Sequence, residues 1–460
     1  MEKMKRIYII VLTIVLGACA DELDIKPQAS LDESLVLTND KNVKNALLGA
    51  YDGLSGYNAT VPGSVGDIWG GGLFLYSELL GINGEISWVG TFNEGREIAG
   101  KNILVNNGFV ENEWTGGYYT INICNNILSA LDVVEAADRA QVEGEALFIR
   151  GSVYFELVRH FALPYSAGNT ATNLGVPIVL KPTRGISDED KVSRNTIAQV
   201  YQQVIDDLTN AEAKLPETND VYATKTAAAA ILSRVYLAMG DFAKARDAAN
   251  RVIESELYEL TATYEEAFNN ASNSTEDIFA MQVSAQDGDN NMITYWSIPE
   301  FGGRDGDVQI EDKHLDLYDP NDDRLNLFYE GAGAIRSGKW KHQFTNVFVV
   351  RLAEMYLTRA EANFRLGTNI GGTPASDVNL IRERVGLDPI DPADLTLDDI
   401  LFERKLELAF EGSAIHDIKR LKGTTSDGYS YDANELVFPI PFREITVNKN
   451  LKQNDGYGDL

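Results

Sequence analysis

A helical repeat in the middle of the chain constrains the fold more than any other feature of the sequence. Residues 225–257 read KTAAAAILSRVYLAMGDFAKARDAANRVIESEL, with small and apolar residues at helical spacing on both sides of a Gly-Asp turn. The packing positions of the tetratricopeptide repeat, about 34 residues long, are filled by Tyr236, Gly240, Phe242, Ala245 and Ala249. Because one such helix pair cannot bury its own apolar face, further pairs must stack on it. We therefore predict a mainly α-helical fold on a tetratricopeptide-repeat scaffold.

The rest of the chain supplies partners for this pair. A second copy begins at residue 349, where Tyr356, Ala360 and Gly367 keep the spacing and a partner helix is predicted at 374–385. Helical periodicity also predicts helices at about 38–54, 111–136, 140–160 and 196–214. About four pairs result, in one domain over residues 37–460, with approximate bounds 38–136, 140–214, 225–257 and 349–386.

Two long insertions interrupt the helical pattern. Residues 55–107 and 258–348 mix glycines, aromatic residues and polar residues without a sustained period. Binding residues concentrate on long loops that a rigid scaffold positions. We therefore expect the two insertions to form the ligand-binding half of the molecule.

The N-terminus predicts export and lipidation. Three basic residues precede an apolar run at 7–16 that is too short to span a bilayer, which is typical of a signal peptide over residues 1–18. Residues 16–19, LGAC, match the lipobox of bacterial lipoproteins, so Cys19 is the predicted acylation site, followed by a flexible tether to about residue 36. An ordinary signal peptide with an incidental cysteine is the alternative.

The second cysteine of the chain, Cys124, lies in the apolar context YYTINICNNIL. No internal disulfide can form once Cys19 is acylated. We expect Cys124 to pack as a small hydrophobic residue.

The charge of the chain excludes some partners. The formal net charge is −29 at pH 7. A surface this acidic disfavours nucleic acids and anionic membranes. We predict no nucleic-acid partner, and contact with the membrane only through the lipid anchor.

The sequence does not predict catalysis. The four histidines are scattered and none has the spacing of a metal-ligand motif: His160, His314, His342 and His416. The sequence has no nucleophile elbow, P-loop or dinucleotide fingerprint. Carboxylate pairs suited to glycoside hydrolysis would occur by chance among 69 acidic residues. We predict a protein that is not an enzyme, with a surface glycosidase as the weakest alternative.

Two acidic segments are candidate calcium-binding sites. Residues 319–323, DPNDD, and residues 287–289, DGD, present oxygen ligands of the kind that Ca²⁺ prefers. Neither segment matches the EF-hand loop. Asx turns, in which the side chains bond backbone amides, are the favoured interpretation, so no cofactor is predicted and a structural calcium stays a weaker option.

Aromatic residues in the insertions give the strongest indication of function. Trp114 precedes a helix at core-like spacing, whereas the sequence leaves the role of Trp340 open. Trp88, Tyr295 and Trp296 lie in polar, glycine-containing loops. Flat aromatic rings provide a large contact area at small entropy cost and suit the flat faces of sugars. We therefore expect exposed rings that contact carbohydrate.

These features together resemble a known family, the SusD/RagB-like outer-membrane lipoproteins of Bacteroidetes, which are nutrient-binding proteins of starch-utilisation-type systems. The resemblance covers essentially the whole chain in the family's order. It is carried by LGAC, WTGGYYTINICNNIL, GEALFIRGSVYFELVRHFALPYS, the two repeat segments, ERKLELAFEGSAIHDIKR and FPIPFREITVNKNLKQNDGY. One departure is IHDIKR, where the family usually has an aromatic residue before the aspartate.

The resemblance implies a cell-surface location, four tetratricopeptide pairs, and partnership with a SusC-like TonB-dependent transporter on which the protein acts as a lid. The acidic residues Asp21, Glu22 and Asp24 resemble the surface-export signal of such lipoproteins, with a solvated leader as the alternative. By position, the family's carbohydrate site maps onto Trp88, Asn83, Glu85, Tyr295, Trp296, Asn290, Asn291 and, more weakly, Trp69.

The leading hypothesis is capture of an oligosaccharide or polysaccharide, and the acidic surface favours a neutral, glucan-like ligand. The alternative is a peptide-binding repeat lipoprotein that uses its concave helical surface. Clamps for peptide carboxylates need cations along the groove. The clearest repeat provides four: Lys225, Arg234, Lys244 and Arg246.

Overall fold

The computed structural model describes residues 37–56, 68–185, 187–285 and 290–458. The predicted signal peptide, Cys19 and the acidic residues that follow lie outside the described residues, as does the Asp-Gly-Asp segment at 287–289. Within the described ranges, none of the helices combines the length and the apolar character that crossing a membrane requires.

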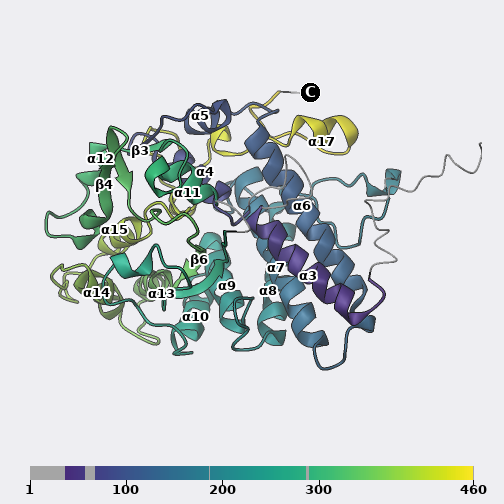
Figure 1. Cartoon of the computed structure of the whole chain (residues 1–460), viewed down its shortest axis with the longest axis horizontal. Helices are drawn as coiled ribbons and strands as arrows, with labels where there is room; N and C mark the ends of the chain where they lie inside the picture. Colours follow the sequence, from purple (N-terminus) through teal and green to yellow (C-terminus); the bar gives the residue numbers. More distant parts are fainter. Residues whose placement is uncertain (1–36, 57–67, 186, 286–289, 459–460) are drawn as a thin grey trace, which may run out of the picture.

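Packed helices form one half of the molecule. Figure 1 shows α3, α6, α7 and α8 side by side, followed by α9, α10 and α13. The bounds of the first six of these helices are α3 Asp40–Ser55, α6 Gly108–Ser129, α7 Arg139–Phe161, α8 Ile197–Lys214, α9 Lys225–Met239 and α10 Phe242–Ile253. The mainly helical, tetratricopeptide-type fold class is confirmed.

The central hairpin folds as its sequence dictates. Thr224 caps α9 by accepting a hydrogen bond from the backbone N–H of Ala227, and Gly240 ends the helix in the left-handed region with φ of 76°. Asp241 then caps α10. The four consecutive alanines near the start of α9, residues 227–230, are buried, which lets the neighbouring helices approach closely.

The second repeat copy and the C-terminal segment complete the scaffold. α13 Leu352–Leu366 pairs with α14 Pro374–Arg384 and packs against α10. A capping box formed by Thr396 and Asp399 opens α15 Leu397–Glu407. α16 Ala414–Leu421 packs on α4 Gly72–Ile82, and α17 Phe442–Val447 lies near the C-terminus.

The two insertions contain more regular structure than the sequence predicted. The first holds α4 Gly72–Ile82, β1 Ile86–Trp88 and α5 Asn93–Ala99. The second holds β2 Asp277–Met281, α11 Asn291–Trp296, β3 Val308–Ile310, α12 Asp312–Leu315, β4 Phe328–Gly331, β5 Ala334–Ser337 and β6 Val347–Arg351. Short 3-10 helices occur at Leu131–Val133, Asp188–Asp190, Glu265–Ala267, Pro299–Phe301, Asp323–Leu327 and Asn434–Leu436.

An antiparallel sheet joins the two insertions. Its strand order is β1-β3-β5-β4, and Ser87 of the first insertion pairs with Gln309 of the second. A separate two-stranded sheet pairs β2 with β6. The first sheet matters for function because it holds two loop segments, far apart in the sequence, next to each other.

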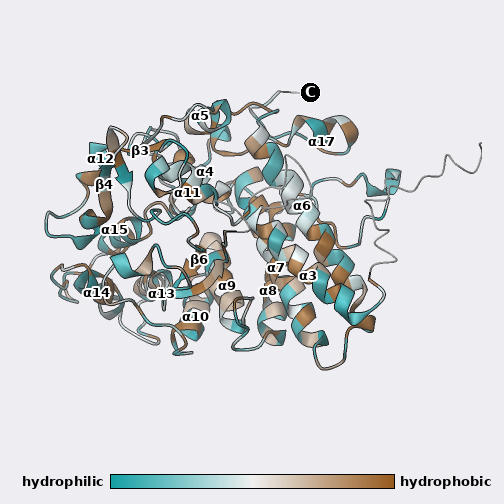
Figure 2. Ribbon diagram, viewed as in Figure 1, coloured by the Kyte–Doolittle hydropathy of each residue, from teal (hydrophilic) through white to brown (hydrophobic). Residues whose placement is uncertain are grey.

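The larger hydrophobic cluster of the described residues extends through both halves, and a smaller one lies among α13, α14 and α15. Figure 2 shows helices with brown apolar and teal polar residues alternating along their length, as expected for helices that bury one side. Trp114 and Cys124 are buried as the sequence predicted, and burial raises the pKa of the Cys124 thiol to about 12. Trp340, whose role the sequence left open, is buried and stacks on Phe348.

Candidate functional site

Four aromatic side chains from three segments gather where the two insertions meet. Trp88 of β1, Phe92, Phe109 of α6 and Tyr295 of α11 form the group that we call the aromatic patch. The ring centroid of Tyr295 lies 5.6 Å from that of Trp88, 6.4 Å from that of Phe92 and 5.9 Å from that of Phe109. The ring centroids of Phe92 and Phe109 are 5.7 Å apart, and the ring planes make an angle of 61°. These separations are those of favourable aromatic pairs.

Local structure fixes the indole of Trp88. The residue ends β1, where its backbone pairs with Val308, and its Nε1 donates a hydrogen bond of 3.1 Å to the carbonyl oxygen of Phe92. The ring lies against Gly95 of α5: a Cβ at position 95 would come within 2.4 Å of the ring. Glycine at this position therefore provides the space that the indole occupies.

The patch presents part of its ring area to solvent. Phe92 is 40% exposed and Val89 beside it is 52% exposed, while Trp88 is half-buried. Tyr295 is buried beneath them. The sequence missed Phe92, although it lies four residues after Trp88 in the same loop. Only the fold shows that its ring joins the two predicted aromatic residues.

Polar groups surround the exposed rings. The guanidinium of Arg304 lies 4.3 Å from the centroid of Phe92, within the range of cation–π contacts, and Asp307 holds it through an ion pair of 2.6 Å. Arg304 also reaches the hydroxyl of Thr91, and Arg96 donates to the side chain of Asn93. A flat apolar surface is thus bordered by hydrogen-bond donors and acceptors.

Two tryptophans expected at the site are instead in the core. Trp296 is fully buried and packs on Phe410 at 5.0 Å, and Trp69 is fully buried with its Nε1 bonded to Glu156 at 3.1 Å. The expectation of exposed indole faces at these two positions is wrong in this structure. Tyr295 and Trp296 are neighbours on one helix, so when Tyr295 faces the patch, Trp296 points into the core.

Glu85 was predicted to meet the ligand, but its carboxylate is buried and occupied. It accepts hydrogen bonds from His314 Nδ1 at 3.0 Å, Lys405 Nζ at 2.8 Å and Ser426 Oγ at 2.5 Å. Burial raises the pKa of the Glu85 carboxyl, but these three bonds outweigh burial and lower it to about 2. Glu85 therefore links its own loop to α12, to α15 and to the loop that contains Ser426.

The three predicted asparagines also bond to the protein. Asn83 donates to Asp427 at 3.1 Å. Asn290 is buried, caps α11 through Ile293 N, and donates to the carbonyl of Thr345. Asn291 begins α11 and is half-buried. The contacts of Asn83 and Asn290 position the loops that carry them.

The described acidic segment forms the turns that the sequence favoured over calcium. Asp319 Oδ1 accepts a hydrogen bond of 2.8 Å from the backbone N–H of Asn321. Asp322 is buried in an ion pair with Arg324 at 2.7 Å. A guanidinium therefore occupies the position next to this carboxylate.

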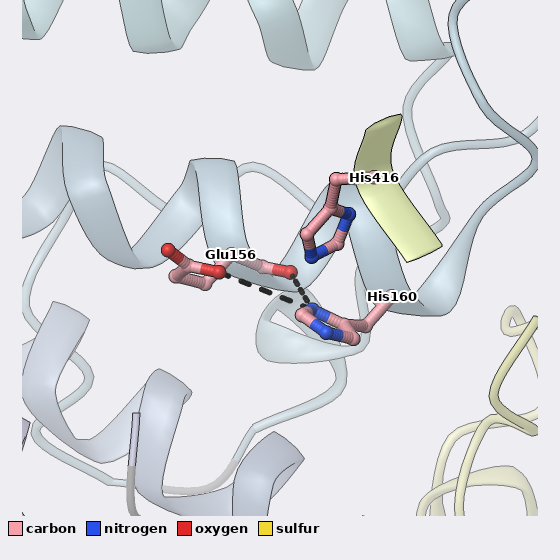
Figure 3. Close-up of side chains that lie close together, drawn as sticks. All are labelled: Glu156, His160 and His416. Carbon is pink, nitrogen blue, oxygen red and sulfur yellow. Dashed lines mark hydrogen bonds and ion pairs between the residues drawn. The ribbon is translucent and has the colours of Figure 1, made fainter. Parts of the chain in front are cut away.

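The fold brings together two histidines that are far apart in the sequence. Figure 3 shows Glu156 and His160 of α7 beside His416 of α16, with one potential ligand atom of each lying within 4.8 Å of the others. Both histidines contact the hydroxyl of Ser77, at 3.0 and 3.2 Å. Their separation of more than 250 residues hid the cluster from spacing motifs.

The surroundings of this cluster do not suit a metal ion. The carboxylate of Glu156 already accepts hydrogen bonds from Trp69 and Arg159. Burial, together with the positive charges of Arg159 and Lys419, lowers the pKa values of His160 and His416 well below the usual range. The same two charges would repel a bound cation.

The cations of the peptide-clamp alternative are largely engaged. Arg234 is paired with Glu354 at 2.5 Å, Arg246 with Asp247 at 2.7 Å and Lys244 with Asp241 at 2.9 Å. Lys225 is exposed at the start of α9. These pairings leave few charges to receive a peptide carboxylate.

The fold and the aromatic patch together define a helical-repeat protein whose loop-rich half displays aromatic rings. Comparison with known proteins identifies this class. One family model, described as "Starch-binding associating with outer membrane", matches residues 77–237, and a second, described as "SusD family", matches residues 328–437.

Individual relatives cover nearly the whole chain. The chain is 26% identical to SusD-like protein P2 of Formosa agariphila, over 99% of its own length and all of the relative. A SusD superfamily structure from Bacteroides thetaiotaomicron has a TM-score of 0.80 at 27% identity, covering 91% of this chain and 100% of that one. The structure of a putative sugar binding protein from Bacteroides vulgatus has a TM-score of 0.79 at 28% identity, covering 91% and 99%. The resemblance of the chain to the SusD-like family is therefore confirmed.

Proposed function

We propose that this protein is a glycan-binding protein that captures oligosaccharides or polysaccharides on the aromatic patch. The observation that carries the proposal is the half-exposed Trp88–Phe92 surface, bordered by Arg304, Asn93 and Thr91. Aromatic faces pack against the apolar faces of sugar rings, while the polar groups bond the hydroxyls. The description of the family as starch-binding and the similarity to a sugar binding protein from Bacteroides vulgatus support a carbohydrate ligand.

The proposed ligand is neutral and glucan-like. The net charge of −29 gives a surface that repels uronate and sulfated polymers. Arg304, whose guanidinium lies 4.3 Å from the centroid of Phe92, is already paired with Asp307 and so does not add a free positive charge for an anionic sugar.

We propose binding without catalysis. Glycoside hydrolysis needs two carboxyl groups placed across the scissile bond. The carboxylate of Asp307, which borders the patch, is buried and bonded to Arg304 by two hydrogen bonds of 3.0 and 2.6 Å. This pairing favours a positioning role for Asp307 over proton transfer.

The proposed cellular setting is the outer surface of the outer membrane. The lipobox at residues 16–19 supports a lipid anchor on Cys19, and the family description supports association with the outer membrane. In this setting the protein would deliver its glycan, as a lid, to a SusC-like TonB-dependent transporter.

Affinity gel electrophoresis tests the binding proposal. The purified protein is run through gels that contain amylopectin, laminarin, galactomannan or pectin, the last as an anionic comparison. We expect retardation by at least one neutral glucan and loss of that retardation in Trp88→Ala and Phe92→Ala. Phe402→Ala removes a ring that is 45% exposed on α15 and serves as the matched control.

Two results would count against the proposal. Equal retardation of wild type and both patch variants would exclude the aromatic patch as the site. Retardation by pectin alone would overturn the neutral-glycan preference while leaving glycan binding in place.

A further inference from the structure

A depression lies on the helical half, away from the exposed rings of the aromatic patch. It has a volume of about 350 Å³ and is bordered by α6, by the segment around residues 179–183 and by α17. In Figure 1, α17 lies beside the upper part of α6. We call this feature the α6 depression.

The floor and rim of the α6 depression are aromatic. Trp114 and Tyr118 form the floor, with ring centroids 4.9 Å apart, and Trp114 packs in turn on Phe161 at 5.0 Å. Tyr118 is fixed by a hydrogen bond of 2.8 Å from its hydroxyl to the carbonyl oxygen of Pro177. Tyr119 stands at the rim with 47% of its surface exposed. A rigid floor and an exposed ring are what a flat apolar ligand face requires.

Donors and acceptors converge on the same depression. Asn122 accepts a hydrogen bond of 2.8 Å from Thr183 N through its Oδ1, and no hydrogen bond within the described residues uses its Nδ2 donor. Thr183 is exposed, so its hydroxyl can donate or accept. Glu444 lines the opposite side and provides a carboxylate that is half-buried.

The chemistry of these groups selects the class of ligand. An exposed phenol ring, an amide donor and a carboxylate acceptor match a sugar ring, which has one apolar face and hydroxyls at its edge. The acidic Glu444 disfavours phosphate, sulfate or uronate. From this geometry we infer that the α6 depression is a second carbohydrate-binding site. It adds contacts to long neutral glycans that are already bound at the aromatic patch. The inference rests on the proposed glycan-binding function.

The position of the depression gives the second site a defined role. Phe109 of the aromatic patch and Tyr119 of the depression lie on the same helix, ten residues or about 15 Å apart along its axis. A glycan of several sugar units can therefore contact both sites, and the second contact then forms at high effective concentration. The second site raises the affinity for long chains and leaves the affinity for short ones unchanged.

Site-resolved NMR tests the inference separately from the proposed function. The protein is labelled with 3-fluorotyrosine, and Tyr119→Phe and Tyr295→Phe assign the two ¹⁹F resonances. The probes are maltoheptaose, laminarihexaose, cellohexaose and mannohexaose. We expect at least one probe to shift both resonances.

The pattern of shifts distinguishes the second site from the aromatic patch. A shift at Tyr295 alone overturns the second site and supports the patch, whereas a shift at Tyr119 alone supports the second site and contradicts the patch. No shift at either tyrosine with any of the four probes overturns both.

A chain-length comparison tests the role of the site. For the glucan with the largest shift, Tyr119→Ala is expected to weaken binding of the polymer about tenfold while leaving the trisaccharide unaffected. Phe402→Ala, which removes a similarly exposed ring from α15, is expected to change neither. Unchanged polymer affinity in Tyr119→Ala would overturn the role.

Discussion

At the scale of single residues, Gly95 determines where the indole of Trp88 lies. A side chain at this position would overlap the ring, since its Cβ would lie 2.4 Å from the nearest ring atom. Gly95→Ala is therefore expected to push Trp88 out of the aromatic patch and to lower glycan affinity about tenfold, which corresponds to 1.4 kcal/mol. Titration calorimetry of the variant against the retained glycan measures the effect.

Gly49→Ala is the matched control for this prediction. Gly49 lies within α3, and nothing lies within 4 Å of a Cβ built there. Alanine at this position should leave glycan binding unchanged and stabilise the fold by roughly 0.5–1 kcal/mol, because glycine is unfavourable inside a helix. Equal glycan affinity in Gly95→Ala and wild type would contradict the role assigned to Gly95.

The buried histidines predict how stability depends on pH. Burial is the main cause that holds the pKa values of His160 and His416 well below 6.5, so both stay neutral in the folded state. The unfolded chain protonates them below about pH 6.5, so their contribution is present above that pH and is lost as pH falls. Each histidine costs at most about 1.4 kcal/mol of unfolding free energy per pH unit.

Urea denaturation at pH 7.5 and pH 5.5 checks this prediction. His416→Gln should reduce the difference between the two unfolding free energies by about 1 kcal/mol. His342→Gln, at an exposed position, should leave the difference as it is in wild type. A difference that is the same in all three proteins would show that His416 titrates normally.

Single residues also mark the limit of what the sequence could predict for the site. Loop context correctly indicated that Trp88 and Tyr295 come together, because both lie in long insertions around a scaffold. It could not distinguish Tyr295 from Trp296, since neighbours on a helix point in different directions and only tertiary packing decides which ring is buried. Phe92 was missed because an isolated phenylalanine in a loop most often packs inside.

At the scale of elements, a buried network of charges joins β6 to α14 and α15. Arg351 of β6 bonds Glu407 at 2.6 Å, Glu411 at 2.8 Å and Glu276 at 3.2 Å. Arg384 of α14 bonds both Glu276 and Glu407. These side chains are at most 8% exposed, so each depends on its partners for compensation of its charge.

Removing one partner should therefore be costly. Arg351→Met leaves buried carboxylates uncompensated and is expected to destabilise the protein by roughly 3–5 kcal/mol. Arg251→Met breaks the pair with Glu212 at the surface, where an ion pair contributes at most about 1 kcal/mol. Chemical denaturation of both variants measures the contrast, and losses of similar size would contradict the importance of the network.

Elements differ in how well the sequence predicts them. Long periodic helices such as α9 and α10 were expected with nearly their observed bounds, because periodicity, caps and the Gly240 turn agree. The strands β1, β3, β4 and β5 were not expected, since each has only three or four residues. Such strands have no readable period and form only when the two insertions pair across the fold.

At the scale of the whole molecule, the proposed function requires the protein to be held at the membrane through Cys19. An acyl chain contributes about 0.8 kcal/mol per buried methylene, and two or more chains give stable attachment. Wild type should sediment with membranes and be released by detergent, whereas Cys19→Ser should be found in the soluble fraction. Membrane sedimentation of Cys19→Ser at the wild-type level would contradict lipid anchoring.

The central claim is that glycan is held on the aromatic patch, and a crystal structure of the protein with bound oligosaccharide tests it most directly. Crystals are soaked with the oligomer of whichever glucan retards the protein in affinity gels. We predict electron density for a sugar ring against Phe92 and Trp88, with hydroxyls near Arg304 or Asn93. Density confined to the surface of α9 and α13, with the patch empty, would contradict the claim.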